Sequence, residues 1–428
     1  MLSLLLIVFV VLVVMGGPVF TALGFSGVIS NGVFMGINPT FLDAGMFSAV
    51  NSWVLLAAPF FLLTGNIMGE CGPAASLFNL CEKCLGHRKG GLPCAVVLTC
   101  VLFGAITGSG LATAVAIGGL AMPELLKRGY DEKYCCGLVG MSGTLGLMIP
   151  PSIYMIIFAS LVSADVLQFF TAGWIPGILL AIMLMIYAVF ASPKTKTERF
   201  PMSERLTALK EALPALTVPV VILISIYSGV FTPTESAGLS VIYSLIVCVA
   251  AYRKQFGFRS FMNAARAAVK TTGQIYIIIA TVTAFSTIIT YANIPQTISN
   301  WAVSNENLTP TLMLLMVCVV YFVFGMFLDP VPILYLTCPI FYPALVAVGV
   351  NPIHFCILTV VMMMIAQCTP PFGVILFGLA GQFRIPVVNV VKGVLPFLAV
   401  VLVGAVILLL IPQISTFLPE LIGVSAYG

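Results

Sequence analysis

Residues 103–110 read FGAITGSG, and residues 143–152 read GTLGLMIPPS. Both stretches place glycine, proline or small hydroxyl residues inside sequence that is otherwise apolar. A lipid bilayer cannot satisfy exposed backbone groups, so a helix that is broken at membrane depth must face protein or a water-filled cavity. Interrupted apolar segments in corresponding places of two halves are typical of a transporter binding site. The two stretches therefore predict such a site if the chain repeats them.

A second copy does occur, about 220 residues later in the chain. Adding 220 to Pro150 and Pro151 gives Pro370 and Pro371, and adding 221 to residues 103–104 gives the FG pair at 324–325. The copy reads FGMFLDP at 324–330 and QCTPPFG at 367–373, and an upstream block, VFT at 19–21, recurs at 230–232. Three blocks in the same order indicate an internal repeat rather than the general frequency of Gly and Pro in membrane helices.

The composition identifies the solvent in which this chain folds. Hydrophobic residues make up 61% of the 428 residues, and charged residues make up 7%. A soluble globular chain carries about 25% charged residues, so the chain is predicted to be a polytopic membrane protein. Its opening apolar run lacks a basic n-region and a small-residue cleavage site, which predicts a retained span. The 12 cysteines lie mostly in apolar segments and predict no disulfide framework.

The positions of the charges predict the topology. All 18 Lys and Arg residues fall in six clusters, at 83–89, 127–133, 194–210, 253–270, 384 and 392. Positive residues collect in cytoplasmic loops, so every segment between two clusters is expected to leave the cytoplasm and return. The predicted external segments carry acidic residues with no Lys or Arg beside them, and these are Asp43, Asp165, Glu235, Glu306 and Glu420. Both termini are predicted to be external.

The charges give the two repeats opposite orientations, as in the inverted repeats of secondary transporters. The predicted fold is all-α. The first repeat is 1–191, with scaffold helices in 1–69, a hairpin at 92–126 and a broken helix at 134–163. An amphipathic cytoplasmic connector at 192–212 follows, and residues 253–270 are amphipathic too. The second repeat is 213–411, with scaffold helices in 213–292, a hairpin at 310–346 and a broken helix at 353–383, and 412–428 form an external tail.

The hairpin arms are too short to cross a membrane. Each arm of about 16 residues gives roughly 24 Å of helix, and the hydrocarbon core is about 30 Å thick. Two re-entrant hairpins therefore fit better than four full spans. The hairpin apexes and the broken helices are expected to meet near the middle of the membrane.

The segments that end at these breaks present unpaired carbonyl groups beside Ser and Thr hydroxyls. Hard cations prefer oxygen ligands, and unwound backbone in transporters binds sodium. The chain is therefore predicted to bind sodium and no transition metal. The predicted sodium ligands are Gly104, Thr107, Gly108, Ser109, Thr144, Ile149, Gly325, Asp329, Ala366 and Thr369.

The segments that begin at the breaks present helix N-termini, whose N–H groups and partial positive charge attract anions. No Lys or Arg lies in the predicted membrane core, so backbone dipoles and cations would hold a carboxylate substrate. The predicted substrate is a small organic anion, such as a dicarboxylate or a sugar acid. The predicted substrate contacts are Ser109, Gly110, Pro151, Ser152, Pro330 and Pro371.

Asp329 is the one acidic residue predicted at the core of the membrane. An ionisable residue there is a functional-site hypothesis by default. An Asp that precedes Pro330 is equally a good helix N-cap. The two roles are compatible, and both remain open at this point.

These motifs resemble the large membrane subunit of tripartite ATP-independent periplasmic (TRAP) transporters. The resemblance covers nearly the whole chain and is carried by FGAITGSG, by MPE at 122–124 with RGYD at 128–131, by GTLG with IPPS, by GMFLD at 325–329, and by PFF at 59–61 with GN at 65–66. It implies sodium-driven uptake of organic acids across the bacterial inner membrane by an elevator motion. It also implies a periplasmic substrate-binding protein and a small membrane subunit, expected on a separate chain because this chain begins directly at the large subunit.

Other functions were weighed against this one. A stand-alone sodium/dicarboxylate symporter or sodium/proton antiporter has the same inverted hairpins but needs no binding protein. An enzyme should bring acid, base or metal ligands together, and the predicted core offers only Asp329. The sequence contains no P-loop, GxSxG or HExxH motif. We therefore expect no enzymatic activity, no cofactor other than the coupling sodium ion, and no nucleic-acid partner.

Overall fold

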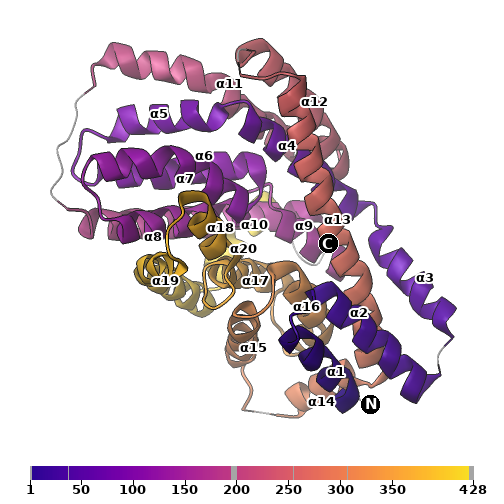
Figure 1. Ribbon diagram of the computed structural model, residues 1–428. Helices are drawn as coiled ribbons and strands as arrows, with labels where there is room; N and C mark the ends of the chain where they lie inside the picture. The colour runs from indigo at the N-terminus through magenta and orange to yellow at the C-terminus, as the bar shows by residue number, and fades with distance from the viewer. Residues whose placement is uncertain (1, 37, 194–199, 254, 306, 424–428) are drawn as a thin grey trace.

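The computed structural model describes residues 2–36, 38–193, 200–253, 255–305 and 307–423, and all regular structure in them is helical (Figure 1). Lys194, Lys196, Arg199, Lys254, Glu306 and residues 424–428 of the predicted tail lie outside the described residues. The elements of the first half are α1 (Leu2–Val14), α2 (Val19–Ser30), a π-helical turn (Asn31–Met35), α3 (Pro39–Val50), a 3-10 turn (Val54–Leu56), α4 (Ala57–Glu70), α5 (Pro73–Leu85), α6 (Gly91–Thr107), α7 (Gly110–Lys127), α8 (Glu132–Gly143), a 3-10 turn (Thr144–Leu147), α9 (Ile153–Val162) and α10 (Val166–Phe190).

The second half follows a similar order. Its elements are α11 (Met202–Tyr227), α12 (Pro233–Ala251), α13 (Phe258–Tyr291), α14 (Ile294–Ser304), α15 (Pro310–Gly325), α16 (Pro330–Ala347), α17 (Pro352–Gln367), α18 (Val374–Phe383), α19 (Val387–Leu410) and α20 (Gln413–Ile422). In each half a pair of helices joined by a tight turn precedes a helix that is interrupted at a Pro-Pro pair. The peptide bonds of both pairs, Pro150-Pro151 and Pro370-Pro371, are cis.

Two helices run through the predicted connectors. The boundary predicted between 212 and 213 lies inside α11, whose Ala208, Ala212 and Ala215 are all fully buried. Their four- and three-residue spacing keeps them on one face, which packs on α5. That continuous small-residue face explains why the amphipathic segment does not separate from the span. In the same way, most of the amphipathic segment 253–270 belongs to the 34-residue helix α13.

Four further helices have no counterpart in the sequence expectations. They are α3, α5, α14 and α20, and the last lies in the segment predicted as an external tail. Helix α3 meets α4 at a bend of 53°, whereas α13 crosses the corresponding part of the second half without a break. Helices α5 and α14 each lie between a scaffold helix and a hairpin, and each begins with a proline in its first turn. Both are short and carry polar residues, so a search of the sequence for long apolar segments does not detect them.

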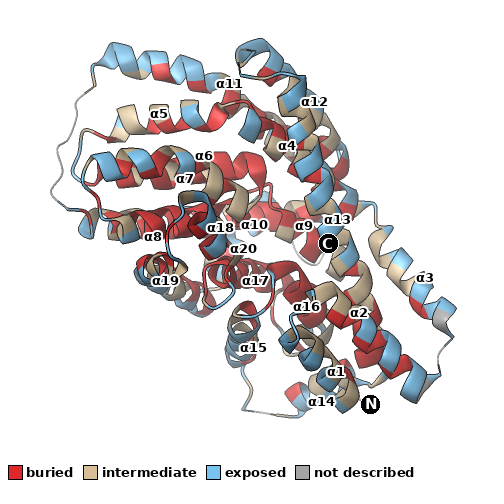
Figure 2. Cartoon of the chain, viewed as in Figure 1, coloured by how far each residue is buried: buried red, intermediate tan, exposed pale blue. Residues whose placement is uncertain are grey.

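The interior is apolar and is centred on the interrupted helices. Every residue of α17 is buried, and buried residues also gather on α6, α8 and α16 (Figure 2). Helix α13 packs against α2, α3 and α4, and α8 packs against α19. A disulfide between Cys71 and Cys248, which the sequence did not predict, joins the ends of α4 and α12.

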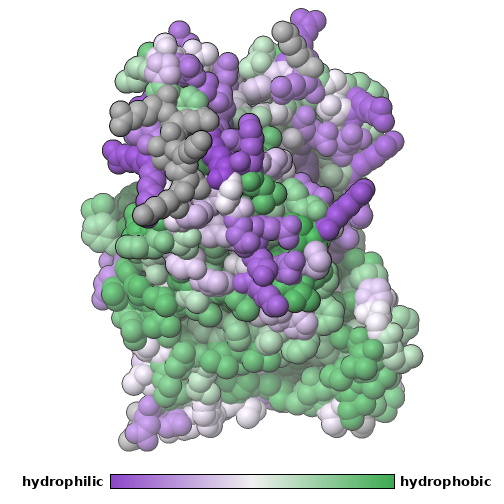
Figure 3. All heavy atoms as spheres, turned by 60° about the vertical axis from the view of Figure 1, so that its left-hand side comes forward, coloured by the Kyte–Doolittle hydropathy of each residue, from purple (hydrophilic) through white to green (hydrophobic). Residues whose placement is uncertain are grey.

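The outer surface matches a membrane environment. Among the described residues, seven helices are long and apolar enough to cross a bilayer, or eight if the bent pair of α3 and α4 forms one span. Figure 3 shows a broad hydrophobic band below an upper end where hydrophilic side chains gather. An exposed band of this kind is stable only against lipid or another protein. The chain is therefore a multi-span helical membrane protein.

Candidate functional site

The first hairpin turns at Gly108 and Ser109, between Thr107 at the end of α6 and the first turn of α7. Gly108 adopts a left-handed conformation with φ of 60°, which favours glycine. Ser109 is extended and is the N-cap of α7, where its hydroxyl accepts a hydrogen bond from the amide of Ala112 at 3.4 Å. Thr113 donates to the carbonyl of Ser109 at 2.8 Å, and its hydroxyl lies 2.8 Å from that of Thr107. The tip is thus a compact group of hydroxyl and carbonyl oxygens.

The first interrupted helix loosens just before its Pro-Pro pair. Helix α8 ends at Gly143 and passes into the 3-10 turn that starts at Thr144, whose hydroxyl donates to the carbonyl of Met141 at 2.7 Å. Ser152 is the extended N-cap residue of α9 but makes no side-chain capping bond. Its buried hydroxyl has no hydrogen-bond partner among the described residues. A buried hydroxyl without a partner is a candidate ligand contact.

The hairpin tip and this interrupted helix touch through their backbones. A Cβ atom added to Gly104 would lie 2.5 Å from the Cα atom of Gly146. One added to Gly108 would lie 2.7 Å from the carbonyl oxygen of Pro151, and one added to Gly110 would lie 3.3 Å from the Cα atom of Thr144. Only glycine permits so close an approach. Three of the predicted ligand positions therefore sit directly against the broken helix.

The second half repeats this contact. A Cβ atom added to Gly325, at the end of α15, would lie 2.5 Å from the Cβ atom of Ala366 in α17. Gly325 and Ala366 are the positions reached by adding 221 to Gly104 and 220 to Gly146. Thr369 lies just beyond α17 and donates to the carbonyl of Ile365 at 2.7 Å. The same hairpin-to-break packing therefore occurs in both halves.

Asp329 occupies the N-cap position of α16, but its side chain makes no capping hydrogen bond. Asp329 is solvent-exposed. Its carboxylate is close enough to the hydroxyl of Tyr154 in α9 for the two groups to interact electrostatically. Ser109, at the other tip, does cap its helix. The two tips are therefore alike in backbone position and different in side-chain bonding.

Two residues that the sequence did not single out join the halves. The amide nitrogen of Gln367, the last residue of α17, donates to the hydroxyl of Tyr154 at 3.0 Å. The side-chain oxygen of Gln367 points toward Gly110, where an added Cβ atom would lie 2.6 Å from it, and this oxygen has no partner among the described residues. Gln367 and Tyr154 thus connect the first hairpin, both broken helices and the region of Asp329. A long amide beside a helix break was the one available signal in the sequence.

Some predicted positions lie away from this centre. The side chain of Ile149 packs on Gly177 of α10, where an added Cβ atom would lie 2.5 Å from it. Pro371 is exposed, and α18 begins at Val374, three residues after Pro371 rather than directly after it as expected. The structure therefore separates Pro371 from the helix start on which its prediction depended. Pro151, Ser152 and Pro330 are buried beside the breaks.

A cavity of about 390 Å³ adjoins the first tip. It lies between α4, the first hairpin and α18, and Asn66, Glu70, Thr107 and Gln382 are among its lining residues. Within the described ranges, no three His, Cys, Asp or Glu side chains gather in a way that could hold a metal ion. Sodium ligands of the predicted kind are carbonyl and hydroxyl oxygens, which the two tips supply.

Together, the apolar spans and the paired helix breaks are typical of a membrane permease of the transporter class. The family model of the tripartite ATP-independent periplasmic transporter, DctM component, matches residues 6–414. The chain belongs to this family, the large permease component of TRAP transporters, and is therefore a transport protein and not an enzyme.

Individual relatives agree over almost the full length. The chain is 36% identical over 407 residues to the C4-dicarboxylate TRAP transporter large permease protein DctM of Pseudomonas aeruginosa, which covers 94% of this chain and 95% of the relative. It is 35% identical over 370 residues to the ectoine TRAP transporter large permease protein TeaC of Halomonas elongata, covering 86% of each. The fold resembles that of the Alcanivorax borkumensis YdaH transporter, with a TM-score of 0.60 at 15% identity over 87% of this chain and 88% of that one.

Proposed function

We propose that this permease carries a small organic anion into the cell together with sodium ions, across the bacterial inner membrane. The observation that carries the proposal is the packing of each hairpin against an interrupted helix, through Gly104 and Gly146 in one half and Gly325 and Ala366 in the other. Each contact gathers carbonyl and hydroxyl oxygens at a place where backbone groups are freed from helical bonding.

Sodium is proposed to bind at both contacts. At the first, Gly104, Thr107, Gly108, Ser109 and Thr144 would supply oxygens, and the predicted carbonyl of Ile149 would take a lesser part because its side chain packs on Gly177. At the second, Gly325, Asp329, Ala366 and Thr369 supply them. The hydroxyl cluster of Thr107 and Thr113 supports the first assignment, because their oxygens lie 2.8 Å apart in a buried position. Oxygen ligands of this kind suit a hard cation.

The substrate is proposed to lie between the tips. Ser109, Gly110, Ser152 and Pro330 begin helices there, with Pro151 beside them, so unpaired N–H groups face the site. The free amide oxygen of Gln367 and the hydroxyl of Ser152 add hydrogen-bonding groups. The dicarboxylate relative favours an organic acid, and the ectoine relative extends the range to other small solutes. Pro371 drops to a secondary role, because its surface is exposed.

The proposed transport cycle follows from an inverted repeat. Residues 1–191 and 213–411 would form the two repeats, with the hairpins and broken helices moving against the scaffold in an elevator motion. Both termini would then be periplasmic. The matching order of helices in the two halves supports the repeat, and the basic clusters support the orientation.

The partners of this permease can be tested by reconstitution. We expect vesicles that contain the chain alone to show no uptake, and uptake to require both a small membrane subunit and a periplasmic binding protein. The uptake assay would use a radiolabelled organic acid, chosen as the tightest ligand in a screen of the binding protein. Because delivery by the binding protein is the proposed route of entry, its omission should reduce uptake to background. Full uptake without either partner would instead identify a stand-alone sodium symporter or antiporter of the same architecture.

A further inference from the structure

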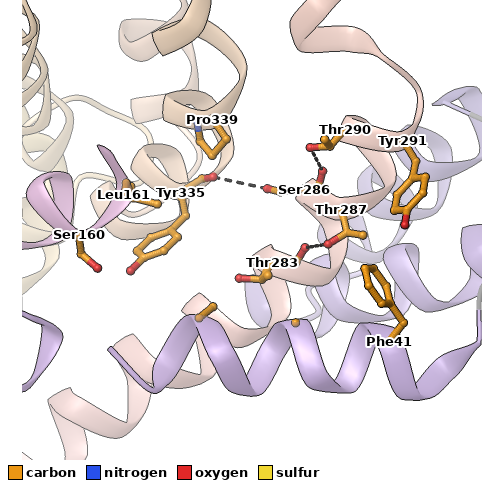
Figure 4. Close-up of a pocket in the computed structure, with 12 residues that line it drawn as sticks. Phe41, Ser160, Leu161, Thr283, Ser286, Thr287, Thr290, Tyr291, Tyr335 and Pro339 are labelled. Atoms are coloured by element: carbon orange, nitrogen blue, oxygen red, sulfur yellow. Dashed lines mark hydrogen bonds between the residues drawn. The ribbon is translucent and has the colours of Figure 1, made fainter. Parts of the chain in front are cut away.

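A second cavity, of about 480 Å³, lies away from the tips between α3, α9, α13 and α16 (Figure 4). Its walls carry hydroxyl groups from three of these helices. They include Ser160 on α9, Thr283, Ser286, Thr287 and Thr290 on α13, and Tyr335 on α16. No charged residue is among the described residues that line it. The lining is uncharged and mixed, with apolar residues such as Phe41, Ala49 and Leu161 facing the Ser and Thr hydroxyls.

The four Ser and Thr hydroxyls that α13 presents to the cavity already donate their protons to backbone carbonyls. Thr283 donates to the carbonyl of Ile279 at 2.8 Å, and Thr287 donates to that of Thr283 at 2.8 Å. Thr290 donates to the carbonyl of Ser286 at 2.9 Å, and the Ser286 hydroxyl donates to the carbonyl of Tyr335 at 3.5 Å (Figure 4). A hydroxyl has one proton and two acceptor lone pairs. This wall therefore offers the cavity acceptors rather than donors.

The internal repeat places this cavity in correspondence with the one beside the first tip. Subtracting 220 from Ser286, Thr290, Tyr335 and Pro339 gives Asn66, Glu70, Val115 and Gly119. All four of these line the 390 Å³ cavity, and the other four line the 480 Å³ cavity. Each cavity thus lies between a scaffold helix and the second arm of a hairpin.

The size and chemistry of the cavity argue against two other occupants. A lipid chain suits the wholly apolar cavity of about 490 Å³ around Phe9 and Phe341 better than a cavity with Ser and Thr hydroxyls along one wall. A bare sodium ion needs oxygens about 2.4 Å away on several sides, and a space of 480 Å³ is far larger than one ion. A hydrated organic solute fits both the volume and the lining.

We propose that the cavity between α13 and α16 is a selectivity site that binds the O–H or N–H groups of the solute, through the acceptor oxygens of Thr283, Ser286, Thr287 and Thr290. The permease would therefore favour hydroxylated organic acids over unsubstituted dicarboxylates. This inference rests on the proposed function, because it assumes that an organic anion is the solute.

The test uses the full chain in lipid nanodiscs, with sodium present and with L-malate and succinate as probes. The two acids differ by one hydroxyl group. Calorimetric titration should show malate binding about tenfold more tightly than succinate, since one additional hydrogen bond is worth about that factor. The double variant Thr283→Val with Thr287→Val keeps side-chain volume and removes two acceptors. It should lose the preference for malate and keep its affinity for succinate.

Two matched variants separate a local effect from a general one. Thr281→Val removes a hydroxyl with the same kind of bond, to the carbonyl of Ile277 at 2.8 Å, on the face of α13 that meets Gly24 of α2. It should leave the preference for malate unchanged. The double variant Thr283→Ser with Thr287→Ser keeps both hydroxyls and should keep the preference for malate. Equal binding of both acids by the wild type, or a preference that survives the double Val variant, would overturn the inference while leaving anion binding intact. Failure of both acids to bind would overturn the inference, whereas the proposed function is tested separately by sodium-dependent uptake of the acid that the binding protein selects.

Discussion

Gly104→Ala is expected to lower sodium-dependent uptake by about a hundredfold. The added methyl group would lie 2.5 Å from the Cα atom and 3.0 Å from the amide nitrogen of Gly146. Backbone atoms cannot move aside as the end of a flexible side chain can, so the hairpin must separate from the broken helix. Overpacking of this kind costs about 1–3 kcal/mol of stability. A displacement near 1 Å at a positioned site can cost about 100-fold in rate.

The measurement is initial uptake in vesicles, normalised to the amount of folded protein. Gly273→Ala is the matched control, because Gly273 also lies within a helix. Apart from the backbone of that helix, no heavy atom lies within 4 Å of a Cβ atom added at Gly273. That control should transport normally. Wild-type uptake by the Gly104→Ala variant would show that the contact between the first hairpin and the broken helix is unnecessary for transport.

Asp329→Asn is expected to raise the sodium concentration for half-maximal uptake by about tenfold, with expression and partner binding unchanged. The carboxylate makes no capping hydrogen bond to α16, and Asn caps a helix about as well as Asp. The substitution therefore removes a negative charge and leaves the helix start as it was. A tenfold change in sodium affinity corresponds to about 1.4 kcal/mol of binding free energy. We expect the loss of one contact between the carboxylate and the cation to have an effect of this size.

Ser109→Ala provides the comparison at the other tip. Its hydroxyl accepts a capping bond from Ala112, so this variant should lose about 1 kcal/mol of stability. It should also weaken sodium dependence, but by less than Asp329→Asn, because a neutral oxygen is removed. If sodium dependence is unchanged in both variants, the tips are structural turns and take no part in coupling.

The interruptions were predictable because they depend on local chemistry. Clusters of proline, glycine and small polar residues favour a break in an apolar helix, so the turns at Gly108 and Asp329 and the breaks at the Pro-Pro pairs could be found from the sequence. Helices α5 and α14 could not, because their short, polar-containing sequences fall below the length of a membrane span. The merging of the predicted connector into α11 depended on its packing against α5, which a local pattern does not contain.

The candidate site was predictable in its parts and not in its assembly. Gly104 and Gly325 stood out as breaks in apolar sequence, but their partners Gly146 and Ala366 follow only from the three-dimensional packing. The hydrogen bond between Gln367 and Tyr154 joins residues 213 positions apart. Such pairings depend on the register between distant helices, and the periodicity of either helix alone carries no information about that register.

The central claim is that a sodium gradient drives uptake through the paired hairpin contacts. It is tested most directly by initial uptake into vesicles that contain the complete transporter, without ATP, under an inward sodium gradient. We predict rapid uptake that falls to background when choline replaces sodium, or when sodium is equal on both sides and the membrane potential is dissipated. Uptake of equal rate in choline, or uptake driven by a proton gradient in the absence of sodium, would contradict the claim.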